Sequence, residues 1–285
     1  MVKIITDSTC DISSDEAEKL GIEILPITIR FGDEEFLDGV NITHEEFYDK
    51  LDRYEELPKT SQISPAVFED IFEKHLKNGD EIAAFFISSE LSGTYQSATI
   101  AAMEVADKYN ANDRLHIVDT QNVSIGSALI IREAVKLRDA GLSAEQIALK
   151  CSELSKHIRL YAMVGSLKYL KKGGRLSSAE AFAGSLLHIT PIISIEKGKV
   201  AIAGKVRGKK AAETFILNKM SEYKINKNHD FIFGHINSLN MLTPFKEKAA
   251  SMVCNINADI ITGSIGCAVG THVGPGTIGV AYIEE

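Results

Sequence analysis

The stretch from residue 81 to residue 119, EIAAFFISSELSGTYQSATIAAMEVADKYNANDRLHIVD, contains the pattern that decides the fold. Its first part, Glu81 to Ser88, is a continuous apolar run that suits a strand buried on both faces. Ser92-Gly93-Thr94 then leads into an amphipathic helical pattern that ends near Asn110, and Leu115 to Asp119 is a second short buried strand. A strand, a helix and a strand in this order indicate parallel βαβ construction.

The same alternation of short strands and helices continues on both sides of this stretch. Capping boxes, a Ser-Pro pair and glycine stops mark the helix ends, and Pro26 gives an extended segment the character of an edge strand because proline has no N–H to donate. The expected elements are a strand at 2–6, a helix from Ser13-x-x-Glu16 to Gly21, an extended segment at 22–31, a helix from Thr43-x-x-Glu46 to about Tyr54, a helix from Ser64-Pro65 to Gly79, and helices at about 121–141 and 143–157.

From Ile158 onward the order of elements changes. The expected elements there are a strand, the basic turn Lys171-Lys172-Gly173-Gly174-Arg175, a helix, a β-hairpin of 191–196 and 200–206 joined by Lys197-Gly198-Lys199, a helix at 208–221, a strand at 229–235, a helix at 243–253, and strands near 259–264 and 278–283. We therefore predict an α/β protein of two domains. Residues 1–157 would form a parallel α/β domain, and residues 158–285 an α+β domain.

The composition excludes several classes of protein. The chain has 285 residues, 45% of them hydrophobic, and a formal net charge of −8, which argues against nucleic acid as the main partner. No run of about 18 apolar residues is present, so no stable membrane insertion is expected. Lys3 leaves no room for a secretory signal, and we expect a cytoplasmic protein. The cysteines and histidines are scattered singly, which predicts small core cysteines and no metal site.

Familiar catalytic motifs do not fit. The run 274–279 matches G-x-G-x-x-G, but only six residues follow it, so no helix and second strand can complete a dinucleotide site. No nucleophile is paired with a base at a recognisable spacing, and no catalytic residue is assigned. The sequence therefore predicts a protein that cannot hydrolyse or transfer an acyl group unaided.

Hydroxyl-rich segments at the ends of strands and starts of helices are the candidate binding residues. They are Asp7-Ser8-Thr9, Thr60-Ser61-Gln62-Ile63-Ser64 and Ser92-Gly93-Thr94. Hydroxyls beside free N–H groups at a helix start can bind an anion, whereas the simpler interpretation is N-capping. We interpret Ser64 as a cap only. Thr60 and Ser61 lie upstream of that cap, where helix initiation does not need them.

Two further features allow alternative interpretations. His272 lies between Gly270 and Gly274, whose lack of a side chain lets a ligand or other backbone approach, although a solvent-facing loop histidine fits the sequence as well. The basic residues either form a solvated surface or bind a phosphate or a partner protein. These residues are Lys171, Lys172, Arg175, Arg207, Lys209 and Lys210.

Seven segments taken in order resemble the DegV family of bacterial fatty-acid-binding proteins. They are KIITDSTCD, KTSQIS, ISSELSGTYQSA, HIVDT, LKYLKKGGRLS, KVRGKKAA and THVGPGTIGVAY, and together they extend over essentially the whole chain. Family members often carry proline where this chain has Ile63. That departure leaves the neighbouring hydroxyls untouched.

The resemblance implies a protein that holds one long-chain fatty acid between its two domains and uses no other cofactor. The carboxylate would accept hydrogen bonds from Ser92, the adjacent helix N-terminus, and Thr60 or Ser61. The candidate ligand-binding residues are Thr60, Ser61, Ser92, Gly93, Thr94 and His272. The resemblance also implies delivery of the acid to an ATP-dependent fatty acid kinase that forms acyl phosphate, as a step in phospholipid metabolism. Arg175 and Arg207 are the candidate contacts to the kinase or the phosphate.

A rival hypothesis belongs to another class of function. The family's fold resembles dihydroxyacetone kinase subunits, so the chain would instead act on a small ketose or a phosphorylated metabolite. His272 would then be a covalent anchor or a base. A carrier should co-purify with a stoichiometric acyl chain, and an enzyme of this kind should not.

Overall fold

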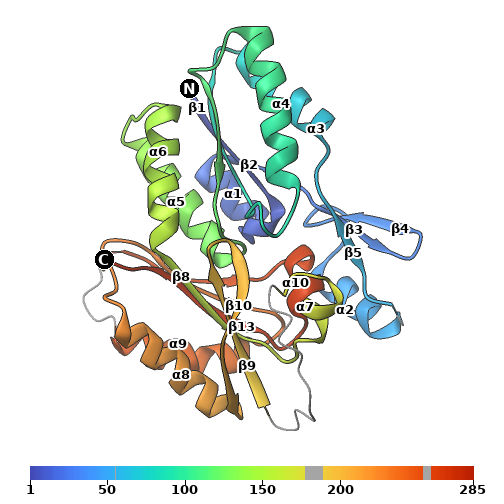
Figure 1. Ribbon diagram of the computed structural model, residues 1–285, viewed down its shortest axis with the longest axis vertical. Helices are drawn as coiled ribbons and strands as arrows, with labels where there is room; N and C mark the ends of the chain where they lie inside the picture. Colours follow the sequence, from blue (N-terminus) through green and yellow to red (C-terminus); the bar gives the residue numbers. More distant parts are fainter. Residues whose placement is uncertain (55, 177–188, 253–257) are drawn as a thin grey trace.

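The computed structural model describes residues 1–54, 56–176, 189–252 and 258–285 (Figure 1). Within them the strands form one sheet of four strands, one of six and one of three. The helix expected after the basic turn and Cys254 lie outside the described residues. Cys10, Cys151 and Cys267 are buried and free, which confirms the prediction of small core cysteines for these three positions.

The first sheet is parallel throughout and has the order β2-β1-β6-β7. Its strands are β1 (Val2–Asp7), β2 (Ile22–Leu25), β6 (Glu81–Phe86) and β7 (Leu115–Asp119). Helix α1 (Ser14–Leu20) joins β1 to β2. Helices α3 (Pro65–Lys77) and α4 (Thr94–Tyr109) cover one face, and α5 (Ile125–Asp139) and α6 (Ala144–Leu154) cover the other (Figure 1).

Burial on both faces explains the unbroken apolar run of β6. Phe85 packs into the core beneath α5 and α6, while Phe86 packs on the opposite side beneath α3 and α4. Both side chains are 0% exposed. Because successive side chains of a strand point to opposite faces, a strand covered by helices on both sides needs apolar residues at every position.

The second sheet is mixed and has the order β10-β9-β8-β13-β11-β12. Only β11 and β12 run parallel to each other among its pairs. Its strands are β8 (Ile158–Met163), β9 (Ile189–Glu196), β10 (Lys199–Arg207), β11 (Phe231–His235), β12 (Ile260–Ser264) and β13 (Ile278–Ile283). Helices α8 (Lys209–Glu222) and α9 (Leu239–Met252) cover one face (Figure 1).

Helix α5 joins the two sheets. It packs on β1 and β6 of the first sheet and on β8, β11 and β13 of the second. Leu160 and Ile232 therefore share one core cluster with Ile4 and Phe85. The fold class is confirmed: this is an α/β protein with a parallel N-terminal sheet and a mixed C-terminal sheet. The proposed domain boundary at 157/158 coincides with the start of β8 and stays a prediction.

The third sheet corrects the expectation of a single extended segment at 22–31. That segment is two strands in different sheets, because the chain leaves the first sheet at Pro26. The third sheet has the order β4-β3-β5, with β3 (Thr28–Phe31), β4 (Glu34–Leu37) and β5 (Lys59–Ser61). We did not predict β4 and β5, since strands this short have little alternating pattern. Helix α2 (His44–Arg53) lies between them in the chain, and its capping box is confirmed.

Other corrections concern short helices and helix ends. Lys171 and Lys172 lie in α7 (Lys168–Lys172) and not in a turn, and Ser64 makes no side-chain cap bond. His272 lies in α10 (Cys267–Val273) and not in a loop, because the glycine with positive φ comes only after it, at Gly274. Helix α9 starts at Leu239 rather than 243, and α5 at Ile125 rather than 121. Two short 3₁₀ helices are η1 (Ser8–Cys10) and η2 (Ser155–His157).

Candidate functional site

A cavity of about 380 Å³ lies where the two large sheets meet. Its polar wall contains Thr60, Ser61, Gln62, Ser92, Arg175 and His272. Its apolar wall contains, among others, Ile27, Ile87, Leu91, Val200, Val269 and Val273. A cavity lined by many aliphatic side chains and a few polar groups is the usual build of a small-molecule site.

The topology of the parallel sheet explains the position of the cavity. The chain runs from β1 outward to β2 on one side and continues in β6 on the other side of β1, so the strand order reverses between β1 and β6. Ligands of open α/β sheets bind outside the carboxyl ends of strands at such a reversal. Thr9, just after β1, and Ile87, just after β6, both line the cavity. The buried Asp7 carboxylate accepts the backbone N–H groups of both and fixes them there.

His272 and Thr60 form a hydrogen-bonded pair in the polar wall. His272 Nε2 lies 2.9 Å from Thr60 Oγ1, although the two residues are 212 positions apart in the chain. Burial, and then the nearby positive charge of Arg175, lower the pKa of His272 to about 4, so the ring is neutral near pH 7. His272 Nδ1 is buried and has no partner within the described residues, and a Cβ at Gly173 would clash with it.

The unpartnered nitrogen indicates the tautomer of His272. A buried N–H without an acceptor is rarer than a buried lone pair without a donor, so the proton belongs on Nε2. Nε2–H then donates to Thr60 Oγ1. The hydroxyl hydrogen of Thr60 is consequently left for another acceptor in the cavity.

Ser92 precedes Gly93, the N-cap residue of α4, and lines the cavity. Its Oγ accepts the backbone N–H of Thr94, the first residue of α4, at 3.2 Å, and lies 3.0 Å from Thr94 Oγ1. This bond supports a role at the start of the helix, and the binding of an anion by this segment stays a prediction. Thr94 itself is 0% exposed and does not line the cavity, so the structure places it behind Ser92 as a support.

Gly93 allows a close contact at the mouth of the cavity. A Cβ at this position would lie 1.9 Å from Oε1 of Gln62. Gln62 Nε2 donates to Ser97 Oγ at 2.9 Å, which ties the segment after β5 to helix α4. Ser61 and Gln62 are exposed and line the cavity, so they lie at its opening. We named Gln62 only as part of a hydroxyl-rich segment and did not predict it as a lining residue.

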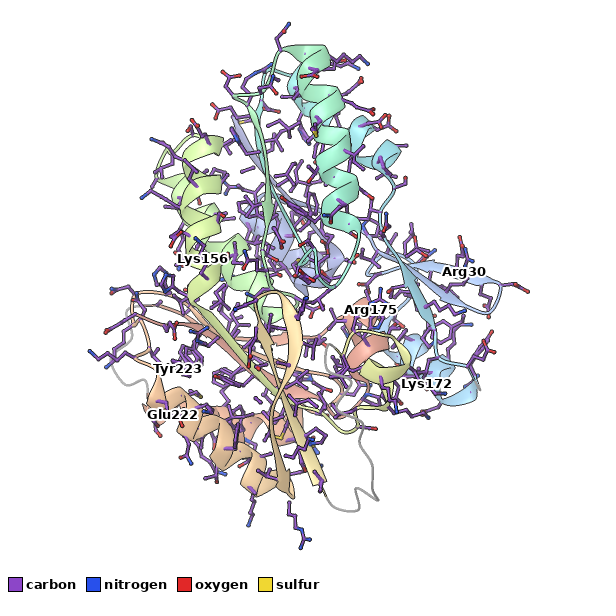
Figure 2. The ribbon with its side chains drawn as sticks, in the orientation of Figure 1. Arg30, Lys156, Lys172, Arg175, Glu222 and Tyr223 are labelled. Atoms are coloured by element: carbon purple, nitrogen blue, oxygen red, sulfur yellow. The ribbon has the colours of Figure 1, made fainter. Side chains whose placement is uncertain are left out.

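Arg175 lies in the wall of the cavity and not with the exposed lysines. Its guanidinium donates to the carbonyl oxygens of Leu91, at 3.3 Å, and Gly173, at 2.6 Å. Figure 2 shows Arg175 near the middle of the molecule, with Lys172 farther out. Arg207, at the end of β10, is exposed and does not line the cavity. The predicted basic residues thus separate into one cavity cation and an exposed set.

The structure therefore brings together six of the eight candidate residues: Thr60, Ser61, Ser92, Gly93, Arg175 and His272. Thr9, named in the hydroxyl-rich segment Asp7-Ser8-Thr9 but not assigned a contact, also lines the cavity, and its pairing with the buried Asp7 is not visible from the sequence. In the described parts of the chain no group of three or more His, Cys, Asp and Glu side chains is placed to hold a metal ion. No helix there is long and apolar enough to cross a membrane.

The comparisons with known proteins extend over the full chain. Residues 1–285 match the family model described as "Uncharacterised protein, DegV family". A DegV domain-containing protein of Clostridium perfringens is 33% identical over 284 residues, which is 100% of this chain and 99% of that protein. Another, from Caldanaerobacter subterraneus, is 34% identical over 289 residues, with 100% and 99% covered.

Two solved structures have the same fold. A DegV family protein of Thermus thermophilus, described as binding fatty acid, has a TM-score of 0.90 and 28% identity, with 100% of this chain and 99% of that chain covered. DegV of Bacillus subtilis, described as a fatty acid binding protein, has a TM-score of 0.85 and 26% identity over the same shares. A family model that matches every residue, together with relatives above 30% identity over their whole length, shows that this chain belongs to the DegV family.

Proposed function

We propose that this protein binds one long-chain fatty acid in the cavity between the sheets, with the carboxylate at the polar wall and the tail against the aliphatic wall. The observation that carries the proposal is that hydroxyl-bearing and aliphatic side chains line one and the same cavity. The fatty acid binding described for the Thermus thermophilus and Bacillus subtilis structures supports it.

The head group would be held by donors that the protein does not use internally. Thr60 can donate its hydroxyl hydrogen because His272 Nε2–H already satisfies its oxygen. Ser92 can do the same when Thr94 Oγ1 donates to it. Arg175 adds a positive charge in the same wall. Hydrogen bonds to a charged acceptor contribute about 1.5–3 kcal/mol each, so these groups orient the acid.

The tail would supply most of the affinity. Transfer of one methylene from water into an apolar site contributes about 0.8 kcal/mol, and a long acyl chain has on the order of ten or more of them. Loss of one head-group bond should therefore weaken binding without abolishing it.

We further propose that the bound acid is presented to an ATP-dependent fatty acid kinase. In that reaction a carboxylate oxygen forms a bond to the γ-phosphorus of ATP, the bond from that phosphorus to its bridging oxygen breaks, and ADP leaves with the electron pair. The position of Ser61 and Gln62 at the opening supports access to the carboxylate from outside. Arg175 would contact the phosphate of the product from inside the wall, and Arg207 would contact the kinase from the surface.

The enzyme hypothesis is less well supported by the geometry. A covalent anchor or base needs a ring nitrogen that faces the ligand, whereas His272 Nε2 is engaged by Thr60 and Nδ1 lies against Gly173. A small ketose would also leave the aliphatic wall without a partner.

Extraction of the protein, purified without detergent, followed by mass spectrometry tests the proposal. We expect about one fatty acid per chain, and rebinding of a fluorescent fatty acid after delipidation. A chain that carries no acyl lipid, fails to rebind it, and instead binds dihydroxyacetone or a sugar phosphate would support the rival hypothesis.

A further inference from the structure

Helix α10 supplies a large share of the cavity wall but has no cap of its own. It carries Ala268, Val269, His272 and Val273, all of which line the cavity. Its N-cap residue is Gly266, which has no side chain to accept the first N–H groups. The helix is short, so its position depends on what holds its amino end.

Two aspartates from the first part of the chain take the place of the missing cap. The N–H of Gly266 donates to Asp11 Oδ1 at 2.8 Å, and the N–H of Cys267 donates to Asp38 Oδ1 at 3.1 Å. The other oxygen of each carboxylate is also occupied. Asp11 Oδ2 accepts the hydroxyl of Ser124, and Asp38 Oδ2 accepts that of Ser8 at 2.9 Å.

Asp38 connects α10 to the sheet that carries Thr60. Its backbone N–H donates to Ile27, directly before β3, at 2.9 Å, and β3 pairs with β5 so that Ile29 lies opposite Thr60. The carboxylate of Asp38 therefore fixes α10, and with it His272, against the sheet that presents Thr60. The 2.9 Å contact between Thr60 and His272 joins the same helix and the same sheet.

We propose that Asp38, assisted by Asp11, is a positioning residue for the fatty-acid head group: its ionised carboxylate holds the amino end of α10 so that His272 meets Thr60. The expected effect on fatty-acid binding rests on the proposed function. The expected effect on the position of His272 does not. A carboxylate is attracted to the positive end of a helix, and a neutral amide of the same shape is attracted much less.

The surroundings of Asp38 make this attachment sensitive to pH. The side chain is 5% exposed, and the titratable groups around it are Asp7 from β1, Asp11 from the end of η1, Tyr48 from α2 and Cys267 from α10. Burial, partly offset by the bonds from Ser8 and α10, raises the pKa of Asp38 to about 6. The carboxylate is therefore charged at pH 8 and largely protonated at pH 5.

The test compares Asp38→Asn with a matched control, Glu81→Gln. Glu81 Oε2 accepts the first N–H of α6 at 2.8 Å, so it is another helix cap supplied from a distant part of the chain, but α6 does not line the cavity. Dissociation constants for a fluorescent fatty acid are measured from pH 5 to pH 8. We expect Asp38→Asn to bind about threefold to tenfold more weakly than wild type at pH 8. The ratio of the two dissociation constants should approach one at pH 5, where Asp38 of the wild type is itself protonated.

Both proteins bind the same fatty acid, so its own change of protonation with pH affects both dissociation constants equally. It therefore cancels in the ratio of the two constants at each pH. A ratio that stays near one, or that exceeds one equally at every pH, would overturn the proposal. Glu81→Gln should bind as wild type does throughout. If Asp38→Asn does not fold, Ser8→Ala replaces it: removal of a bond to the ionised carboxylate raises the pKa of Asp38, so weakening should begin at higher pH than in wild type.

The ring of His272 gives a readout without any fatty acid. In the ligand-free protein its Cε1–H NMR signal reports the surroundings of the ring at each pH. At pH 8 the wild-type ring is neutral, because its pKa is lowered to about 4, and Asp38 is charged. We expect Asp38→Asn to shift this signal at pH 8, because α10 is displaced, and the difference from wild type to shrink at pH 5, where Asp38 of the wild type is itself protonated. Identical His272 signals at pH 8 would refute the positioning role. If neither protein binds a fatty acid, the proposed function fails while this readout still decides the inference.

Discussion

Each end of the parallel sheet borders a hollow, and the two hollows differ in the side chains that line them. A groove of about 660 Å³ lies at the amino end, and the cavity of about 380 Å³ lies at the carboxyl end. In the groove, Arg138 donates to the carbonyl oxygens of Leu20 and Gly21, and Glu81 accepts the N–H of Ala144. In the cavity, Thr60 and Ser92 keep hydrogens available beside an aliphatic wall. The cavity is the better candidate site although it is smaller, because its hydroxyls lie among aliphatic side chains at the carboxyl ends of the strands.

The largest expected difference between the two ends concerns their arginines. We expect Arg175→Ala to lower acyl-phosphate formation by a cognate kinase about a hundredfold, since a charge positioned at the reacting group is worth about that much. Lipid binding should change much less, because the tail dominates affinity. Steady-state phosphorylation and direct titration of a fluorescent fatty acid measure the two effects.

Arg138→Ala at the amino end is the matched control and should leave both readouts unchanged. If Arg175→Ala weakens lipid binding as severely as phosphorylation, Arg175 belongs to the fatty-acid site alone. The proposed contact to phosphate would then be wrong.

The next largest effect is expected at Ser92, and Ser143 is its counterpart at the other end of the sheet. The hydroxyl of each accepts an N–H group at the start of a helix. Ser92→Ala should raise the dissociation constant of a fatty acid about tenfold or more, because it removes one bond to a charged acceptor. It should also lower the melting temperature, since the bond at the start of α4 is lost. Ser143 caps α6 in the groove, so Ser143→Ala should lower the melting temperature only.

Combination with Thr60→Val and Ser61→Ala sharpens the test. If these hydroxyls share one carboxylate, the combined loss with Ser92→Ala is smaller than the sum of the separate losses. Strict additivity in titrations would place the hydroxyls in separate networks.

A smaller effect is expected at Arg207, which is exposed and does not line the cavity. Arg207→Ala should slow phosphorylation about fivefold at low salt and less at high salt, because exposed charges act mainly on the rate of encounter. Lipid affinity should not change. Kinase assays at two ionic strengths provide the measurement, and an effect independent of salt would argue against a role in encounter.

The smallest effect concerns stability at the amino end alone. Glu23 is desolvated by burial, which opposes ionisation, but its bonds to His75 and Lys74 outweigh this and lower its pKa. A lowered pKa in the folded state contributes stability above the pKa of the unfolded chain, and this stability is lost as pH falls through the folded value. Glu23→Gln should cost roughly 1 kcal/mol at pH 7 and less at pH 3.

Urea unfolding at the two pH values measures this change. Fatty-acid binding should be unaffected, since Glu23 does not line the cavity. Weaker binding by Glu23→Gln would show that the two ends of the sheet are coupled.

The amino-acid sequence alone predicted the parts of the molecule whose pattern is local. The apolar run of β6, the capping box of α2, and the hairpin at Lys197-Gly198 each depend on residues a few positions apart. The same holds for the hydroxyl-rich segments, because composition and chain position mark them. Tertiary contacts overrode the pattern at 22–31, where Pro26 let the chain pass from one sheet to another.

Only the tertiary structure decided which candidates meet. His272 contacts Thr60 across 212 positions, Arg175 turns into the cavity while Lys171 and Lys172 stay outside, and Thr94 lies buried behind Ser92. None of these outcomes follows from residue type or spacing. The direction of a side chain is set by packing and hydrogen bonds from distant segments, as at α10, whose amino end is held by aspartates more than two hundred residues away.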